Sequence, residues 1–591
     1  MGARLVAMVV EGTQGRYYVK AEPEHTAAAE VEPPEGLLST FLPDQALGFR
    51  VQAYGLTQHS QLFTRRQLLM LDVFSELVSS AVDRAKRDGA SDRYAQALAA
   101  YLVLSIGRLA NRSSSQSFWH PNGEKVEQVF ARNALPMIWV FAEGNPFSHS
   151  SGNFEGQLRY LENALLGVPA RGVGVVDQRD ARVLASDEPV LVVTDPPYYD
   201  NVPYADLSDF FYVWLRRAGQ AFFPDLFSTL LVPKVQELIA EPARQGSAKA
   251  AKQFFEDGLA DVFERVSEAQ TEAAPAVFFY AFKQAEGDIE ASGRASTGWD
   301  TMLTALMEKG FVITATWPVR TELHGGLRKL GRNSLASSIV VSCRKRSASA
   351  PMSTRREFLE LLRTELPPAL KTLQHGNVAP VDLAQASIGP GMAVYSRYSK
   401  VIEMDGAPMT VRTALSLINI VLDDVVAEQE GEFDGDTRWA IAWFEQFGLQ
   451  TGEFGDAETL SRAKGTSVDG MVRAGILEAQ GGKVRLLRRD ELDEDWDPTT
   501  DRRLTVWEMA QHLIQRLDHG EASAAMLARQ LGSNAEIARD LAYRLYLVCE
   551  RKKWAQEALA YNGLVVAWPQ IQRLAAAEPA SAGPSQTSFE V

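Results

Sequence analysis

The stretch from residue 170 to residue 350 constrains the fold most, because strand-like and helix-like patterns alternate along it. A short, continuously apolar run at Val190–Thr194 is typical of a strand buried in a parallel sheet. Strands separated by helices predict a doubly wound α/β sheet, and two final strands without a helix between them predict an antiparallel pair at its end. The other predicted elements are the helices Phe254–Ala269 and Trp299–Lys309 and the strands Ala276–Phe282, Phe311–Trp317 and Ser337–Cys343.

Length and composition place the chain among multi-domain globular proteins. Its 591 residues, at about 100 to 200 residues per domain, predict roughly three to five units. No apolar run is long enough to span a membrane, and Cys343 and Cys549 are too few for a zinc cluster or a disulfide framework. The expected location is therefore the cytoplasm. A net charge of −15 argues against non-specific coating of nucleic acid but allows a local basic groove.

The pattern outside this sheet predicts helices with few strands. Within residues 431–490, three short helices and a hairpin that turns at Gly481-Gly482 suggest a winged-helix-like module, which could bind DNA or pack against its neighbours. The other predicted parts are a small β-rich segment (1–60), a helical scaffold (61–169) with helices Thr64–Val78 and Ser91–Leu109, a catalytic core built on the predicted sheet (170–350), a helical connector (351–430), a helical domain (498–574) and a disordered tail (575–591).

The residues most suggestive of chemistry directly follow the first predicted strand. Asp195-Pro196-Pro197-Tyr198 would stand at its carboxyl end, where open α/β sheets bind ligands. The fixed φ of Pro196 and Pro197 would hold the carboxylate and the ring rigidly. Asp195 and the Pro196 carbonyl can each accept one N–H of an exocyclic amine, while Tyr198 can stack on the heterocycle. This arrangement would free the lone pair of the amino nitrogen for attack.

The segment resembles the catalytic motif (D/N/S)-P-P-(Y/F/W) of the amino-group DNA methyltransferases. The wider run Asp195–Arg217 resembles that of the large bacterial adenine-specific DNA methylases, which begin with a domain of unknown function. The likeness covers most of the chain. It continues through Ala134–Phe147, Thr316–Glu322, Asn333–Val341, Gly431–Ala440, Thr466–Asp469 and Ala542–Tyr546.

The resemblance implies a Rossmann-like, S-adenosylmethionine-dependent methyltransferase sheet and a target base flipped out of double-stranded DNA. It implies that Asp195 and Pro196 hold the amine, Pro197 stiffens the turn and Tyr198 stacks on the base. Adenine N6 is the expected target, and cytosine N4 stays open because the same four residues serve either amine. A role in restriction-modification or phage defence is implied by the resemblance only.

One part of the family pattern is missing from this sequence, the loop Asp-x-Phe-x-Gly-x-Gly after the first strand. Gly172-Val-Gly174 lacks the preceding acid and aromatic residue, and Gly389-Pro-Gly391 precedes no convincing helix. The sheet is therefore expected to be incomplete or split: the sequence resembles the C-terminal two-thirds of such an enzyme, either truncated or one half of a split enzyme. In the second case a partner chain would carry the glycine loop. A non-catalytic DNA-binding or assembly subunit is the alternative. The candidate S-adenosylmethionine contacts that remain are Asn145, Pro146, Phe147, Asp180 and Ala181.

A basic segment is the last candidate feature. Between Arg320 and Arg356, nine basic residues stand against one acid, a local charge of +8 that favours binding of DNA phosphate. The histidines and the acidic runs show no metal-ligand spacing, so no metal is expected. The predicted DNA contacts are Tyr199, Asn201 and Tyr204, which follow the motif, and Arg320, Arg328, Lys329 and Arg332.

Overall fold

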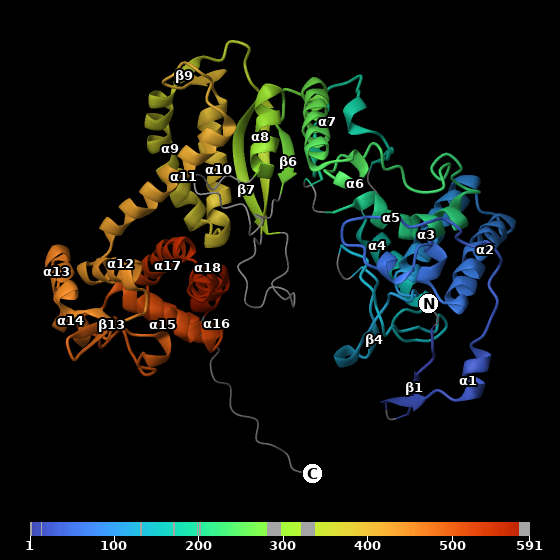
Figure 1. The fold of residues 1–591 in the computed structure, drawn as a ribbon, viewed down its shortest axis with the longest axis horizontal. Helices are drawn as coiled ribbons and strands as arrows, with labels where there is room; N and C mark the ends of the chain where they lie inside the picture. The colour runs from blue at the N-terminus through green and yellow to red at the C-terminus, as the bar shows by residue number, and fades with distance from the viewer. Residues whose placement is uncertain are drawn as a thin grey trace. The chain divides into compact units, whose positions relative to one another are not determined.

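The chain folds into two compact units (Figure 1). The first combines Met1–Asp180 with Pro197–Gly258, and the second combines Ala181–Pro196 with Leu259–Val591. One crossing between the units falls inside the predicted catalytic motif, between Pro196 and Pro197. The computed structural model describes residues 3–13, 15–130, 133–168, 172–197, 199, 202–280, 297–320 and 337–577.

Three long helices form the core of the first unit. The helices α2 (Arg65–Arg87) and α3 (Asp92–Ala110) confirm the two amphipathic helices predicted from the sequence, and α5 (Tyr204–Gly219) packs against both. Trp214 of α5 is fully buried among them. The unit also contains β1 (Ala7–Gly12), β2 (Gly15–Lys20), α1 (Pro23–Ala28), β3 (Trp119–His120), β4 (Lys125–Val126), α4 (Phe154–Gly167), α6 (Pro242–Gln245) and the first half of α7 (Ala248–Ala269).

Side-chain caps explain where the two predicted helices begin. The hydroxyl of Thr64 accepts the backbone N–H of Gln67 at the start of α2, and the hydroxyl of Ser91 accepts that of Tyr94 at the start of α3. Because the first N–H groups of a helix lack partners within it, each cap satisfies one of them.

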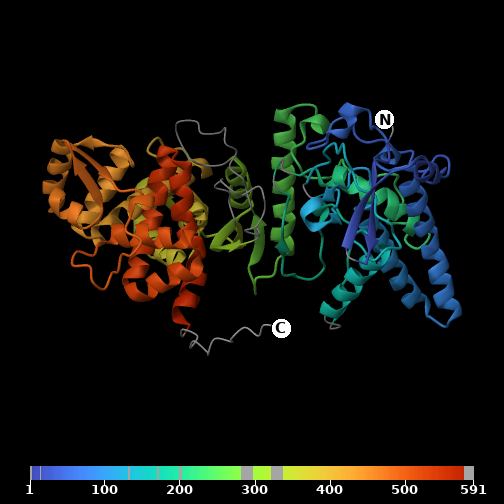
Figure 2. The same ribbon diagram turned by 90° about the horizontal axis from the view of Figure 1, so that it is seen from below.

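The second unit is built on a mixed four-stranded sheet in the order β5-β6-β8-β7. The strands are β5 (Val193–Thr194), β6 (Ala276–Tyr280), β7 (Phe311–Arg320) and β8 (Ser337–Lys345). β5 is parallel to β6, and β8 is antiparallel to both of its neighbours, so the predicted antiparallel final pair is confirmed. Figures 1 and 2 show this sheet between α7 and the helices α9 to α11. The predicted helix before β7 is α8 (Thr297–Glu308).

The connector region contains more than helices. Its helices are α9 (Arg355–His375), α10 (Pro380–Ser396) and α11 (Val411–Glu428), and α10 packs against β7. The sequence analysis missed a short parallel strand pair, β9 (Met352–Thr354) and β10 (Lys400–Ile402). Each strand has only three residues, too few to show an alternating pattern.

The three helices and the hairpin predicted within residues 431–490 are all present. Gly481 and Gly482 adopt φ values of +60° and +77°, which favour glycine in a two-residue hairpin turn. A further strand, β11, pairs with β13 and completes a three-stranded sheet in the order β11-β13-β12. The elements are α12 (Gly435–Phe447), β11 (Gly452–Glu453), α13 (Phe454–Lys464), α14 (Val468–Arg473), β12 (Leu477–Gln480) and β13 (Lys483–Leu486).

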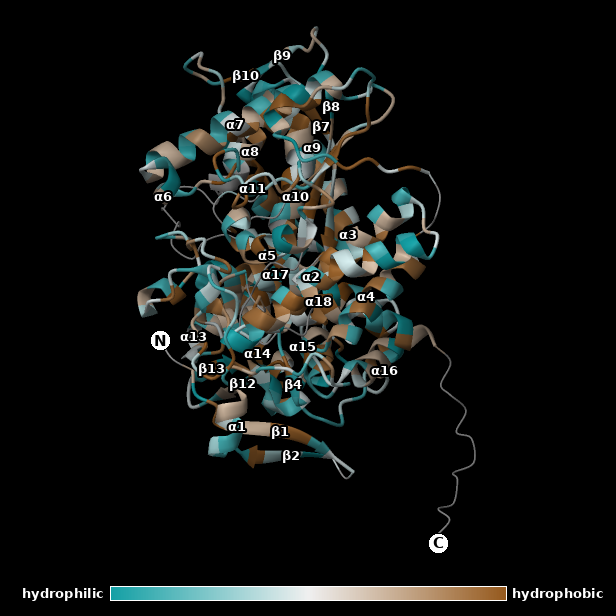
Figure 3. Ribbon diagram, turned by 90° about the vertical axis from the view of Figure 1, so that its right-hand side faces the viewer, coloured by the Kyte–Doolittle hydropathy of each residue, from teal (hydrophilic) through white to brown (hydrophobic). Residues whose placement is uncertain are grey.

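Four helices end the second unit: α15 (Val506–Asp518), α16 (Glu521–Leu531), α17 (Asn534–Lys552) and α18 (Ala555–Ala576). The last helix reaches Ala576, so the predicted boundary of the tail at residue 575 is slightly too early; residues 578–591 lie outside the described part. Figure 3 shows polar and apolar residues interspersed along the helices. Within the described residues, no helix has the length and apolar content needed to cross a membrane.

Candidate active site

β5 carries the predicted motif at its carboxyl end. It runs parallel to β6, with Val193 opposite Val277 and Thr194 opposite Phe278. Asp195 follows directly and is exposed. Its carboxylate therefore stands at the end of a parallel strand, the part of an α/β sheet where ligands bind.

The prediction of a fully buried strand over Val190–Thr194 is wrong. Only the last two residues form β5, and Val190 adds an isolated bridge to Gln270. Leu191 is 58% exposed and Val193 is 57% exposed. Side chains of a strand point to the two faces of a sheet, so the exposure of Leu191 and Val193 shows that other elements among the described residues do not cover these faces. A continuous apolar run is typical of a strand covered on both faces, and this strand is not covered in that way.

Directly after the motif, Tyr199 adopts a left-handed backbone conformation with φ of +53°. Such a conformation is unfavourable for a bulky residue and persists where its surroundings hold it. The N–H of Tyr199 donates to the carbonyl of Pro197 at 3.2 Å, which makes a tight turn. The ring packs edge-on against the buried Phe255 at 5.2 Å between centroids. This residue was predicted to contact DNA, and the structure shows its ring in an intramolecular contact.

Residues 234–245, which we name the clamp segment, bond to both ends of the turn that follows the motif. The backbone N–H of Ala240 donates to the carbonyl of Tyr199 at 3.0 Å. The carboxylate of Glu237 accepts the backbone N–H of Ala205, in the first turn of α5, at 2.8 Å. The chain from residue 199 to residue 205 is therefore tied at each end to one segment.

Arg244 holds the clamp segment against α5. Its guanidinium donates to Glu237 at 2.5 Å and to Asp206 at 2.6 Å. Asp206 is 3% exposed, and its Oδ1 has no hydrogen-bond partner among the described residues. Burial works against the charged guanidinium, but its hydrogen bonds to Glu237 and Asp206 outweigh this effect and raise the pKa of Arg244. Arg244 is thus the cation that compensates the buried Asp206 and the partly buried Glu237.

A second buried ion pair fixes the start of the clamp segment. Asp209, fully buried in α5, accepts from the Nζ of Lys234 at 2.6 Å and from the backbone N–H of Val232 at 2.8 Å. Burial raises the pKa of Asp209 despite these bonds. His59 is also buried, and burial, with a smaller contribution from the charge of Lys234, lowers its pKa to about 4.

The sequence analysis did not single out these charged residues. A signal was present, because Asp206 and Asp209 share a helix face with Phe210 and Val213 in an otherwise apolar stripe. Carboxylates on a buried helix face require cations. The sequence could not show that the cations come from the clamp segment.

The other predicted DNA contacts are placed only in part. Tyr204 begins α5 and is 47% exposed, and Arg320 is the last residue of β7. Tyr198 of the motif and the predicted contacts Asn201, Arg328, Lys329 and Arg332 lie outside the described residues.

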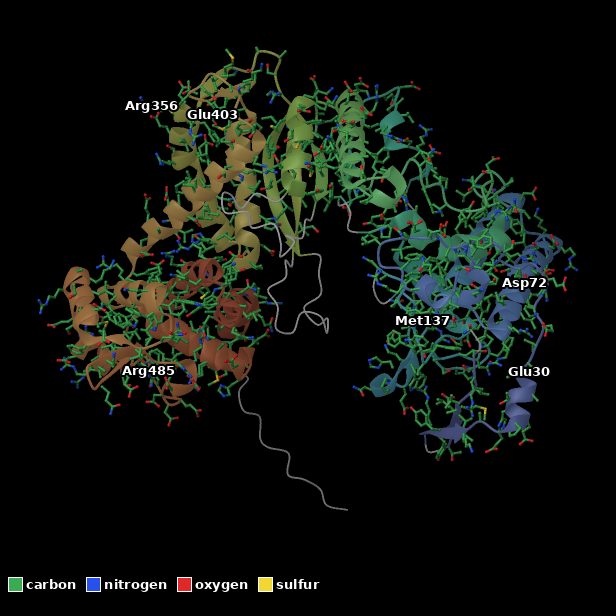
Figure 4. The ribbon with its side chains drawn as sticks, in the orientation of Figure 1. Glu30, Asp72, Met137, Arg356, Glu403 and Arg485 are labelled. Atoms are coloured by element: carbon green, nitrogen blue, oxygen red, sulfur yellow. The ribbon has the colours of Figure 1, made fainter. Side chains whose placement is uncertain are left out.

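Several arginines of the basic segment bond within the protein. Arg344 donates to the carbonyl of Glu272 at 2.8 Å, and Arg346 donates to that of Met307 at 3.1 Å. Farther along, the guanidinium of Arg355 lies 3.0 Å from a carboxylate oxygen of Glu403, and that of Arg356 lies 2.9 Å from one of Glu360. Arg356 and Glu403 are labelled in Figure 4. The end of this segment therefore contributes to the fold, which leaves phosphate binding as a prediction for residues 320–332.

The residues predicted to contact the cofactor divide between the units. In the first unit, Asn145 Oδ1 accepts the N–H of Phe147 at 3.0 Å, and the carbonyl of Pro146 accepts the N–H of Phe154 at 2.9 Å. The Phe147 side chain is 81% exposed, so its ring could stack on an adenine. Asp180 ends the first segment of that unit, and Ala181 begins the second unit.

The glycine pairs do not supply the missing cofactor loop. Gly389 and Gly391 lie inside α10. A Cβ added at Gly389 would lie 1.7 Å from the Thr316 side chain, and one added at Gly391 would lie 2.5 Å from the Ile418 side chain. These glycines allow close packing of a helix. Gly172 has a φ of +80° and lies in irregular chain. Neither glycine pair therefore forms a turn that leads from a strand into a helix.

The cations of the β12–β13 hairpin are matched by carboxylates. Lys483 bonds to Glu453, and Arg485, labelled in Figure 4, donates to Glu491 at 2.6 Å. Cations held in ion pairs are less available to phosphates. The geometry favours packing over DNA binding for this module.

Both cysteines are buried and free. Burial raises the pKa of Cys343, and it raises that of Cys549 to about 12. Neither thiol is therefore a nucleophile near neutral pH.

Comparison with known proteins gives one match. A family model described as "Domain of unknown function (DUF8807)" matches residues 434–589, which contain the winged-helix-like module and the C-terminal helices. No curated protein and no solved structure matches the chain.

Proposed function

We propose that this chain is the amine-binding part of an S-adenosylmethionine-dependent DNA methyltransferase that acts on adenine N6. The observation that supports this most is the position of Asp195 and Pro196, at the carboxyl end of a strand in a mixed α/β sheet and just before a strained turn. The proposal includes a Rossmann-like sheet that is incomplete or split.

In this proposal Asp195 and Pro196 act on the amino group. The Asp195 carboxylate accepts one N–H, and the Pro196 carbonyl accepts the other. Two acceptors out of the plane of the base draw the nitrogen toward tetrahedral geometry, so its lone pair is available for attack. The ring of Pro197 fixes its φ and so limits the conformations of the turn, and Tyr198 stacks on the flipped base.

The proposed contacts to the cofactor lie outside the Asp195–Tyr198 motif. Phe147 and Asp180 could contact an adenosine, but neither Gly172-Val-Gly174 nor Gly389-Pro-Gly391 forms a turn before a helix that could receive the methionine part. We therefore propose that a second chain that carries this loop completes the cofactor site. Double-stranded DNA is the proposed substrate, in restriction-modification or phage defence within a bacterial cytoplasm.

Two alternatives remain within the proposal. The motif serves cytosine N4 equally well, because both targets are exocyclic amines. A non-catalytic DNA-binding or assembly subunit is favoured by one observation, the use of Gly389 and Gly391 for helix packing.

The test uses the tagged chain purified from its native host with the proteins that accompany it. We expect transfer of labelled methyl groups from S-adenosylmethionine to DNA, and digestion to nucleosides should yield N6-methyladenine. Asp195→Ala should abolish transfer. Recovery of N4-methylcytosine would select the first alternative, and equal transfer by Asp195→Ala would show that the motif is not catalytic.

A further inference from the structure

The clamp segment is placed to control the motif without touching the substrate. It bonds to Tyr199 through Ala240 and to Ala205 through Glu237, so it holds both ends of the turn that follows Pro197. Ile239 and Ala240 are buried, which limits movement of the segment.

The left-handed backbone of Tyr199 requires such support. Left to itself, a tyrosine at φ of +53° would relax toward negative φ. The N–H of Ala240 fixes the Tyr199 carbonyl, and Phe255 fixes its ring. Tyr199 directly follows the motif, so these contacts hold the chain at the point where the motif ends.

Arg244 is the residue on which this arrangement depends. One guanidinium joins Glu237 of the clamp segment to Asp206 of α5, and its side chain is 18% exposed. Loss of this cation would leave the buried Asp206 and the partly buried Glu237 without their shared partner and would push the clamp segment away from α5.

We propose that Arg244 is a positioning residue of the amine-binding motif, acting through Glu237, Asp206 and the Ala240–Tyr199 hydrogen bond. The inference rests on the proposed function. It adds that the turn that begins at Tyr199, directly after the motif, is held by the ion cluster of Arg244, Glu237 and Asp206.

The chain offers a closely matched control. Arg217, at the other end of α5, also joins a buried aspartate to a glutamate, with Asp72 at 2.7 Å and Glu76 at 3.1 Å. Arg217→Gln therefore breaks the same kind of pair in the same unit, without a bond to the turn after the motif.

The experiment compares Arg244→Gln, Arg244→Lys and Arg217→Gln in the tagged chain purified from its native host. Arg244→Gln should lower kcat for methyl transfer about 10- to 100-fold and change KM for DNA less than about 2-fold, because misplacement affects the reacting geometry. Arg244→Lys, which keeps the charge, should recover part of the loss. Arg217→Gln should stay within about 2-fold of the wild type in kcat.

Hydrogen exchange provides a measurement that does not depend on activity. Arg244→Gln should reduce protection of the Ala205 and Ala240 amides at least about 10-fold, and Arg217→Gln should leave both amides protected. Equal losses of kcat in the two glutamine variants, no recovery by lysine, or unchanged protection of the two amides would each overturn the inference. A wild-type chain that transfers no methyl groups would refute the proposed function instead, and the exchange measurement would still decide whether Arg244 holds the turn.

Discussion

The two sides of the Asp195-Pro196-Pro197 motif are held in different ways. On the strand side, β5 has two residues, and Leu191 and Val193 are more than half exposed. On the helix side, α5 begins with buried carboxylates that bind Arg244 and Lys234. Within the described residues, one side has an open sheet edge, whereas the other is surrounded by the chain's own ion pairs.

This difference indicates which part of the site the chain completes itself. The helix side already has its bonding partners, so the turn after Pro197 is fixed by residues of this protein. On the strand side, an edge strand presents unpaired backbone N–H and C=O groups, and a further strand would pair with them. The comparison agrees with the proposal that another chain completes the cofactor half.

On the helix side of the motif, a large effect is expected from Arg244→Met. The substitution leaves the buried Asp206 and the partly buried Glu237 without their cation and should lower the local free energy of unfolding by about 3 kcal/mol. Hydrogen exchange of peptides from α5 measures this change. The double variant Arg244→Met/Asp206→Asn should recover about 1 to 3 kcal/mol. Strict additivity of the two substitutions would show that the pair is not coupled.

The next expected effect is a pH dependence of the free energy of unfolding that arises from His59. Its pKa is about 4 in the folded protein and about 6.5 when unfolded, so the unfolded chain binds a proton that the folded chain does not. The free energy of unfolding should therefore fall as pH drops from about 6.5 to about 4, by about 3 kcal/mol in total.

Urea unfolding at several pH values tests this, with His59→Gln as the control that does not titrate. The difference in stability between the wild type and this variant should change over that pH interval. If it is constant across the interval, His59 does not titrate differently in the two states.

The smallest effect is expected on the strand side. Leu191→Ala should change the free energy of unfolding by no more than about 0.5 kcal/mol, because the side chain is more than half exposed. Phe278→Ala, in the adjacent strand β6, removes a fully buried ring and should lower the free energy of unfolding by about 3 to 5 kcal/mol. Similar losses for both variants, measured by urea unfolding, would show that the edge strand is covered in solution.

Much of the fold could be predicted from the sequence because its patterns are local. The apolar spacing in α2 and α3, the capping residues Thr64 and Ser91, and the Gly481-Gly482 turn each act within a few residues. The short strands β9 and β10 were missed because their pairing joins segments far apart in the sequence.

Only the motif of the candidate site could be predicted from the sequence. The motif itself could be recognised because it follows an apolar run, but the exposure of Leu191 depends on which strands lie beside β5. The role of Arg244 depends on tertiary contacts with Asp206 that no spacing reveals. For the same reason, Gly389 could be recognised as a packing residue only once α10 was seen against β7.

The most direct test of the central claim is mass spectrometry of nucleosides from the native host's DNA, with the wild-type chain and with Asp195→Ala. The account predicts N6-methyladenine that depends on this chain in the wild type and its loss in the variant, with the Asp195→Ala protein present at normal abundance. An unchanged level of methylated adenine in the variant would contradict the account.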